Sequence, residues 1–350
     1  MSLRSGLAFF ALALVTTAVA QDPRVSQVTR AAEDYLAQGK VPGFTVAISE
    51  NGKVVYAKGF GSVNTQAEAP AGPLTLYRLA SVSKPLTAFA VMKLVEQGKV
   101  KLDDDIRTYV PNFPDKGVKI TVRNILSHQS GIRHYVAGHT DGGKHYATCN
   151  DALEVFANDP LLFNPGERYS YSTHAFTLLG ALIENVTHSS YDDALESTLR
   201  KPAQVQTPRV ENRQDDDSSR SELYTLSADK SFRWIRPDDL TWKMPGGGTE
   251  ATAVDLCKLG SAVLDGKIVS ESTLRAMWTP QRTNDGKTTT YGLGWAIGAD
   301  HVDHSGSQAG AESIWILYPA QKVVVTVLSN LQGNPIEKLG SQIAGIWLRR

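Results

Sequence analysis

A serine and a lysine three residues apart are the pair in this chain whose types and spacing best suit chemistry. They are Ser81 and Lys84, in the stretch RLASVSKPLTA at residues 78–88. Residues three apart share one face of a helix, and Pro85 fits only a first turn, so we predict that the two meet at a helix N-terminus. Ser81 could then act as a nucleophile, with Lys84 accepting its proton if burial or a nearby cation lowers the lysine pKa. A capping serine beside a surface lysine would produce the same pattern, so the interpretation needs partners.

Two further stretches carry groups that could complete such a site. Tyr171–Thr173 (YST) immediately precedes a helical pattern, and His304–Ser307 (HSGS) is expected just before a strand. Taken alone, a packed tyrosine and an ordinary loop histidine would explain these stretches. Their order along the chain behind S-x-x-K favours one shared site instead.

With these motifs in order, the chain resembles the serine β-lactamase and penicillin-binding-protein superfamily, in its class C and esterase-like branch. The family motif S-x-x-K matches residues 81–84, Y-x-N matches 171–173, and K-T-G matches 304–306. Flanking stretches such as ILSHQSGI, FNPGERYSYS and PGGGTEATAVDL are also similar, and the resemblance covers about residues 25–349. SHQSGIRHY and YST look most like the branch of the mitochondrial serine β-lactamase-like protease.

The resemblance implies an acyl-enzyme mechanism without a cofactor or metal. Ser81 would attack a carbonyl, while Lys84 and Tyr171 would share its proton, Tyr171 acting as a phenolate or through a hydrogen-bond relay. The backbone N–H groups of Ser81 and Ser307 would form the oxyanion hole. The residues expected to line the substrate site are Thr173, His304, Ser305 and Gly306.

Two departures from the family pattern concern substrate recognition. Thr173 replaces an asparagine whose amide could both donate to and accept from a substrate amide. His304 replaces a lysine, and we expect this histidine to titrate near neutral pH, so that binding of a substrate carboxylate would depend on pH. Asp303 could orient His304 or raise its pKa. Both changes favour an esterase or peptidase over an efficient β-lactamase.

Hydrophobic periodicity predicts the elements that must position these residues. Helical patterns cover about residues 23–38, 84–98, 173–187 and 334–350. FTVAISE and KVVYAKG alternate on either side of Asn51-Gly52, which indicates a hairpin with a two-residue turn. Three short late stretches are predicted strands, namely YGLGWAIG, ESIWILYP and KVVVTVLSN.

Within these patterns, two helices have a defined apolar face and one polar stretch stands out. The residues on the apolar stripe of the helix after Lys84 are Leu86, Phe89, Met92 or Lys93, and Val95. The residues on the apolar face of the closing helix are Ile336, Leu339, Ile343 and Trp347. The polar stretch ENRQDDDSSRSELY at 211–224 is interpreted as an exposed loop.

Strands at both ends and helices between them predict an α+β fold, which the resemblance makes β-lactamase/transpeptidase-like. An antiparallel sheet from the two terminal segments would pack against the terminal helices. We expect a single domain over residues 21–350. Its α/β lobe would comprise about 22–80 and 245–350, and an inserted helical lobe about 81–244, with the site in the cleft between them.

Composition excludes several classes of function. The 350 residues contain 36 basic and 36 acidic side chains, which is not the balance of a nucleic-acid or anionic-membrane binder. Residues 1–20 have the form of a secretory signal peptide cut before Gln21, so we expect an exported protein, periplasmic or secreted, without stable membrane insertion. The sequence does not specify an oligomeric state.

The cysteine and histidine residues raise the questions of a disulfide and of a metal site. Cys149 and Cys257 could pair in an oxidising compartment or remain buried thiols. His134, His139 and His145 fall within twelve residues, but no zinc signature accompanies them, and a polar loop explains them better than a metal site.

The sequence therefore predicts an exported serine hydrolase acting on ester or amide bonds of a small-molecule or peptide substrate. An esterase or peptidase ranks first, a D-Ala-D-Ala carboxypeptidase or penicillin-binding protein second, and a β-lactamase third. The alternative from a different class is an idle scaffold or peptide-binding module with the same fold.

Overall fold

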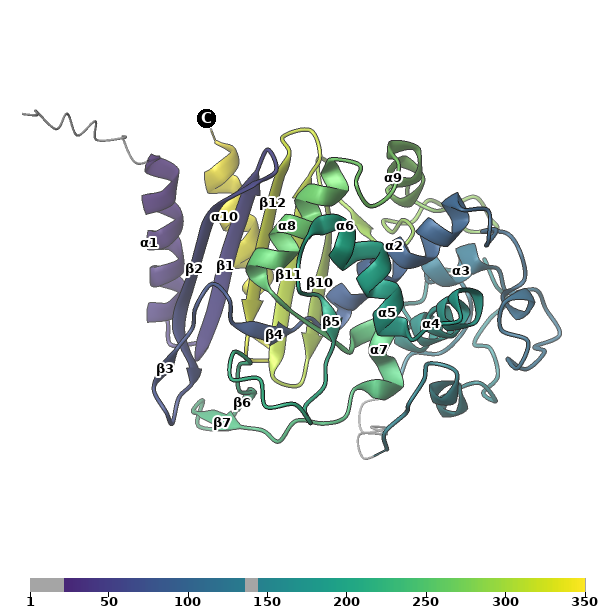
Figure 1. Cartoon of the computed structure of the whole chain (residues 1–350), viewed down its shortest axis with the longest axis horizontal. Helices are drawn as coiled ribbons and strands as arrows, with labels where there is room; N and C mark the ends of the chain where they lie inside the picture. Colours follow the sequence, from purple (N-terminus) through teal and green to yellow (C-terminus); the bar gives the residue numbers. More distant parts are fainter. Residues whose placement is uncertain (1–21, 136–143, 350) are drawn as a thin grey trace, which may run out of the picture.

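A seven-stranded antiparallel sheet forms the centre of the protein (Figure 1). The computed structural model describes residues 22–135 and 144–349, so the expected signal peptide and His139 lie outside the described residues. The strand order is β3-β2-β1-β12-β11-β10-β9. The strands are β1 (Gly43–Glu50), β2 (Lys53–Asn64), β3 (Ala69–Pro70), β9 (Ala296–Ile297), β10 (Val302–Gln308), β11 (Ala311–Tyr318) and β12 (Val323–Ser329). Segments from both ends of the chain thus meet at the β1–β12 pair, as predicted.

The helices gather beside this sheet and on its two faces (Figure 1). The longer ones are α1 (Pro23–Ala37), α2 (Ser83–Glu96), α4 (Thr173–Thr187), α8 (Ala253–Leu264) and α10 (Ile336–Leu348). The shorter ones are η1 (Ala80–Val82), η2 (Ile106–Thr108), α3 (Val122–Leu126), η3 (Asp151–Val155), α5 (Tyr191–Leu195), η4 (Glu196–Arg200), α6 (Lys201–Ala203), η5 (Thr241–Lys243), α7 (Met244–Gly247) and α9 (Glu271–Met277). The predicted α+β fold is confirmed.

Two small sheets complete the strands. One has the order β4-β8-β5, from β4 (Leu76–Arg78), β8 (Thr249–Thr252) and β5 (Arg209–Val210). The other pairs β6 (Tyr224–Leu226) with β7 (Phe232–Trp234). Because β4 leads directly into η1 and α2, the first of these sheets fixes the point at which the chain crosses from the strands into the helices.

Each face of the large sheet is covered by helices because its strands are apolar on both sides. Phe44, Val46 and Ile48 of β1 pack with the buried faces of α1 and α10. The intervening Ala47 belongs to a second core that includes α2, α4 and α8. The predicted apolar face of α10 is confirmed, since all four of its residues are buried.

The β1–β2 hairpin also forms as predicted. Asn51 and Gly52 have φ values of 50° and 80°, the left-handed conformations that a two-residue turn of this type requires. Asparagine and glycine adopt positive φ at little cost. For that reason, these two residues alone were enough to predict the turn of the hairpin.

Helix α2 differs from the predicted amphipathic helix. Leu86, Phe89 and Met92 are buried as expected, but Ala88 and Val91, which lie off that stripe, are buried as well. The helix is enclosed by α4, α5 and α7 and by the second core, so it has no broad solvent-facing side. Such an all-round apolar helix belongs in the interior.

Two strand predictions need correction. Only Ala296–Ile297 of the stretch YGLGWAIG is a strand, because Gly294 takes a φ of 83° and Leu293 bonds to Met277 instead of a neighbouring strand. His304–Ser307 does not precede a strand but lies within β10. It pairs with β11 in a continuous register that places His304 opposite Trp315.

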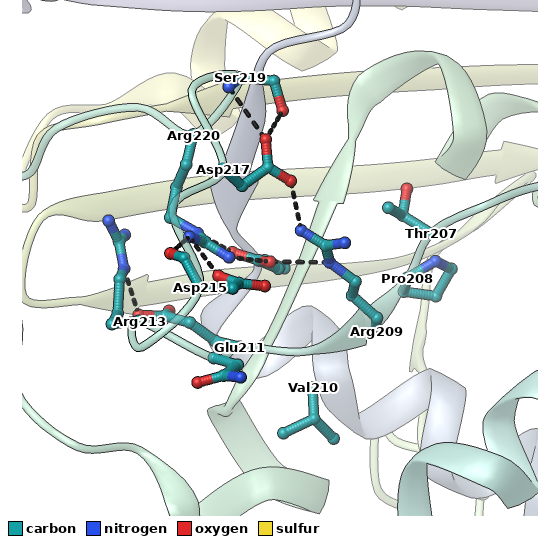
Figure 2. Close-up of polar contacts among 12 residues, drawn as sticks. Thr207, Pro208, Arg209, Val210, Glu211, Arg213, Asp215, Asp217, Ser219 and Arg220 are labelled. Carbon is teal, nitrogen blue, oxygen red and sulfur yellow. Dashed lines mark hydrogen bonds and ion pairs between the residues drawn. The ribbon is translucent and has the colours of Figure 1, made fainter.

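The polar segment 211–224 lies outside the helices and strands up to Leu223, and Tyr224 begins β6, but the segment is not the exposed loop that was predicted. Glu211 is buried, and Arg220 pairs with the buried Glu250 of β8 (Figure 2). Arg209 links the same Glu250 to Asp217. Ion pairs therefore hold a highly charged segment against the small sheet, which composition alone did not indicate.

Cys149 and Cys257 are both buried and unpaired, which favours the interpretation as two buried thiols. In the described part of the chain, no helix combines the length and the apolar character needed to cross a membrane.

Candidate active site

Ser81 lies at the turn where β4 passes into α2. Residues Ala80–Val82 form a 3-10 turn, and the α-helix begins at Ser83. Lys84 Nζ lies 3.1 Å from Ser81 Oγ, so the predicted meeting of the two side chains is confirmed. Ser83 points elsewhere, donating to the carbonyl oxygen of Ala80 and lying 2.7 Å from Thr249 Oγ1.

The backbone just before Ser81 has an uncommon conformation. Ala80 is buried with a φ of 47°, a region that residues with a side chain rarely occupy. The Ser83 hydroxyl holds its carbonyl at 2.7 Å, which helps to fix the turn. Backbone strain of this kind persists only where surrounding contacts hold it, and it is frequent at functional sites.

Lys84 is fully buried, and its hydrogen-bond partners within the described residues are all neutral. Its Nζ lies 2.6 Å from the carbonyl oxygen of Gly246 and 3.1 Å from Thr173 Oγ1. Burial, and then the positive charge of Lys243, lower the pKa of Lys84 well below its ordinary value. A neutral amine has two N–H groups, which suit Gly246 and Thr173, and its lone pair then faces Ser81. The arrangement fits a base that removes the serine proton.

Tyr171 completes this group from the segment that leads into α4. Lys84 Nζ lies 4.6 Å from the centroid of its ring. Burial raises the pKa of Tyr171 above its ordinary value, although a hydrogen bond with Ser81 acts in the opposite direction. Of the two roles considered from sequence, the phenolate is therefore disfavoured, and a neutral phenol that relays a proton fits the site.

Strand β10 lies against the Ser81 turn through Gly306. A Cβ atom on Gly306 would come within 2.4 Å of the carbonyl oxygen of Leu79 and 2.8 Å of Ser81 N. Glycine is required because these backbone atoms, together with Ser313 Oγ at 2.5 Å, occupy that space. Ser307 follows on the same strand with its backbone near the turn, and its hydroxyl donates to Glu312 at 2.6 Å. The oxyanion hole of Ser81 and Ser307 N–H groups stays a prediction that this packing supports.

His304 does not behave as predicted. It is buried, its Nδ1 lies 2.6 Å from the carbonyl oxygen of Ser305, and its Nε2 lies 2.9 Å from Tyr291 Oη. Nδ1 therefore carries the proton and Nε2 accepts from the tyrosine. Burial lowers the pKa of His304 to about 3, so the expected titration near neutral pH is wrong. Asp303 does not orient this ring, because its carboxylate lies 3.3 Å from His301.

Two histidines that sequence reasoning did not place in the site support the start of α4. His128 Nδ1 accepts from the backbone N–H of Ser172 at 3.1 Å, and His134 Nδ1 accepts from that of Thr173 at 3.1 Å. Burial lowers the pKa of His128 well below its ordinary value and that of His134 to about 4. Both are thus neutral acceptors. Their stretch SHQSGIRHY marked a family resemblance, but nothing in its spacing indicated these contacts.

The histidines considered for a metal site serve separate contacts. His134 faces Thr173, whereas His145 Nδ1 lies 2.9 Å from Asp239. Within residues 22–135 and 144–349, no cluster of three or more His, Cys, Asp or Glu side chains is placed to hold a metal ion.

Lys243 is a further residue that the sequence did not single out. It ends η5, is buried, and its charge contributes to the lowered pKa of Lys84. A lone lysine in a polar stretch carries no sequence signal, so only the fold could place it here.

The fold and the order of the three motifs define a β-lactamase-like protein. The beta-lactamase family model matches residues 28–343, and the chain belongs to that family. The mouse "Serine beta-lactamase-like protein LACTB, mitochondrial" is 26% identical over 421 residues, which cover 87% of this chain and 76% of that protein. The predicted resemblance is confirmed.

Solved structures agree with this assignment. The octameric penicillin-binding protein homologue from Pyrococcus abyssi has a TM-score of 0.79 and 28% identity, covering 93% of this chain and 77% of that one. EstCE1, described as a hydrolase with promiscuous acyltransferase activity, has a TM-score of 0.77 and covers 94% of this chain and 99% of that one. At 22% identity, the second likeness concerns the fold alone.

Proposed function

We propose that the protein is a serine hydrolase that cleaves ester or amide bonds through an acyl-enzyme on Ser81. The observation that carries the proposal is the contact of Ser81 Oγ with the amine of Lys84, which is buried among neutral groups. A lysine of lowered pKa beside a serine hydroxyl is one way to activate that nucleophile. Membership of the beta-lactamase family is consistent with this activity.

In the proposed reaction, Ser81 Oγ forms a bond to the substrate carbonyl carbon while its proton passes to Lys84 Nζ. The N–H groups of Ser81 and Ser307 would stabilise the resulting oxyanion. The bond to the leaving group then breaks, and the leaving alcohol or amine takes up the proton, relayed through the neutral phenol of Tyr171. A water molecule attacks the acyl group by the same route in reverse and frees Ser81 as the acid is released.

Neutral side chains at two positions favour esters and peptides over β-lactams. His304, uncharged above a pKa of about 3, offers no cation for the carboxylate of a penicillin. Thr173 is engaged with Lys84 and presents one hydroxyl in place of an amide. A penicillin-binding peptidase is the second candidate because the relative from Pyrococcus abyssi is described as a penicillin-binding protein homologue.

The test combines turnover with intact mass. The protein lacking residues 1–20 is incubated with a p-nitrophenyl ester, a D-Ala-D-Ala peptide and a penicillin, and the Ser81→Ala variant serves as the control. We expect ester or peptide turnover that the variant loses, with an acyl adduct mapping to Ser81. Rapid penicillin turnover would instead indicate a β-lactamase, and a long-lived penicillin adduct a penicillin-binding peptidase. Turnover that survives in Ser81→Ala would overturn the proposal, and no turnover or adduct at all would favour the scaffold.

Export is a second part of the proposal. It rests on the signal-like residues 1–20 alone. N-terminal sequencing of the protein recovered from outside the cytoplasm should begin at Gln21, and recovery of the uncleaved chain inside the cell would contradict it.

A further inference from the structure

Beside Lys84, two buried polar side chains converge on one glycine. Lys243 and Gln308 are each about 6% exposed. A Cβ atom on Gly247 would lie 3.5 Å from Gln308 Oε1 and 3.5 Å from Lys243 Cδ, so both side chains border the space that this glycine leaves open. Gly247 follows Gly246, whose carbonyl oxygen binds Lys84 Nζ. The pair therefore lies next to the base, one residue from its backbone partner.

Neither side chain has its polar groups satisfied within the described residues. Both the oxygen and the nitrogen of the Gln308 amide are buried without a hydrogen-bond partner there. Lys243 Nζ makes no hydrogen bond or ion pair in the same part of the chain, and it lies 5.0 Å from the ring centroid of Trp242 and 5.4 Å from that of Tyr135. Buried polar groups are nearly always paired in native proteins, so an unpaired buried amide beside an ammonium without a counter-ion suits a polar ligand.

The acids nearest to Lys243 are already engaged. Glu211 and Asp238 both bind Arg78, at 2.7 Å in each case, and Glu211 also binds Arg213. Their charges act on Lys243 only at a distance, and burial still lowers its pKa to about 8. Lys243 therefore remains a cation near neutral pH, without a direct counter-ion among the residues that the structure describes.

From this geometry we propose that Lys243 and Gln308 form a subsite for a carboxylate carried by the substrate. The ammonium supplies the charge, and the amide supplies an N–H donor once it flips and exchanges the positions of its Oε1 and Nε2. Gln308 directly follows Ser307 of the proposed oxyanion hole, so the subsite adjoins the reacting carbonyl. The inference rests on the proposed function and narrows its substrates to acidic esters or amides.

The test uses two matched pairs of esters, one for each side of the scissile bond. The first pair is the mono-p-nitrophenyl ester of adipic acid and its neutral methyl ester, with the carboxylate on the acyl side. The second is the butyrate ester of 3-hydroxybenzoate and that of its methyl ester, with the carboxylate on the leaving side. The readout is the ratio of kcat/KM for acid to neutral ester, compared among variants so that intrinsic reactivity cancels.

We expect the acid to be preferred in one pair, and Lys243→Met to reduce that ratio about tenfold, as for the loss of one charge-assisted hydrogen bond. Gln308→Leu should reduce it a few-fold. Gly247→Ala keeps both side chains but adds a methyl group to the space between them, so it should also reduce the ratio. This variant provides a second test of the subsite if Lys243→Met does not fold. Lys287→Met, at an 84% exposed side chain, is the matched control and should keep the wild-type ratio.

The ratio should also fall as pH rises through the lowered pKa of Lys243, since only the protonated amine attracts a carboxylate. The charged groups acting on this amine are Arg78, Glu211 and Asp238, with Lys84 nearby and neutral. If Lys243 acts only by lowering the pKa of Lys84, its loss would change both esters equally and leave the ratio unchanged.

An unchanged ratio in Lys243→Met and Gly247→Ala, or no preference in either pair, would overturn the subsite while the neutral ester is still hydrolysed. Failure of the proposed function looks different, since Ser81→Ala would then hydrolyse the neutral ester as fast as the wild type does.

Discussion

Two buried basic side chains six residues apart, Arg78 and Lys84, have opposite electrostatic surroundings. Arg78 binds Glu211 through Nε at 2.7 Å and Asp238 through Nη1 at 2.7 Å, and these acids raise its pKa although burial acts to lower it. Among the described residues, the hydrogen-bond partners of the Lys84 amine are two hydroxyls and a carbonyl, and its pKa is lowered. Burial is similar at both sites, so the partners decide which cation keeps its charge.

The difference separates a structural role from a reactive one within a single stretch of chain. Arg78 ends β4 and also donates to the carbonyl oxygen of Ala309, just after β10, so it ties together the two segments that flank Ser81. From Glu211 the ion pairs extend to Arg213. A separate set of ion pairs surrounds Glu250, which lies opposite Arg78 on β8 and binds Arg209 and Arg220. Figure 2 labels Arg209, Arg213 and Arg220 of these two sets. The ion pairs of Arg78 hold the turn that carries Ser81. The amine of Lys84 lies beside them without an acidic partner, which suits the proposed exchange of a proton with Ser81.

The largest expected effect on activity comes from removing the amine of Lys84. Lys84→Met should lower kcat/KM by about 10²–10⁴-fold, the range for loss of a general base. Its stability should change less than that of a variant of the Arg78 ion pairs, because no charge is left buried. Ester hydrolysis and urea unfolding measure the two quantities. Wild-type activity in Lys84→Met would contradict the role of this lysine.

Breaking the ion pairs of Arg78 should have its main effect on stability, unlike the loss of Lys84. Glu211→Leu leaves the buried Arg78 with only Asp238, and we expect a loss of about 3–5 kcal/mol in the free energy of unfolding. Urea denaturation measures it. Glu271→Leu, which removes an 83% exposed partner of Arg275, is the matched control and should change stability far less. If both variants lost the same free energy of unfolding, burial would not make the Arg78–Glu211 ion pair more important for stability than an exposed one.

Giving Lys84 a carboxylate should make it resemble Arg78. Thr173→Asp places an acid where a hydroxyl now lies 3.1 Å from Nζ, and an adjacent opposite charge raises a lysine pKa. The pKa of Lys84 should then rise by about 1–3, and below the raised pKa the rate should fall by up to about tenfold for each step of one in that rise, with recovery as the pH is raised. Thr173→Asn is the uncharged control of the same shape. Identical pH–rate profiles for the two variants would contradict this explanation.

The smallest change is expected at His304. The proposed base must be neutral, so the wild-type rate should fall as pH drops through the lowered pKa of Lys84 and stay level above it. His304 is already neutral above about 3, so His304→Gln should leave the position of this acid limb where it is, whatever happens to the rate. A displaced limb in the pH–rate profile would show that His304 carries charge after all.

Much of the fold and part of the site could be predicted because the signals were local. The Asn51-Gly52 turn and the apolar face of α10 depend on neighbours within a few residues, and so does the approach of Ser81 to Lys84 one turn later. The strand boundaries that were predicted wrongly depend on partners far away in the sequence. Strand β10 includes His304–Ser307 only because β11 pairs along its whole length.

By itself, the sequence determined the α+β order of elements, the three motifs and the family, since motif order and periodicity are properties of the chain. Only the tertiary structure decided the charge states on which the chemistry depends. A pKa reflects burial and the charges of groups far away in sequence, and residues over a hundred positions apart set it here. Gly246, Lys243 and Glu211 reach Lys84 and Arg78 only after folding, and they determine which of the two buried basic side chains suits the role of the proposed base.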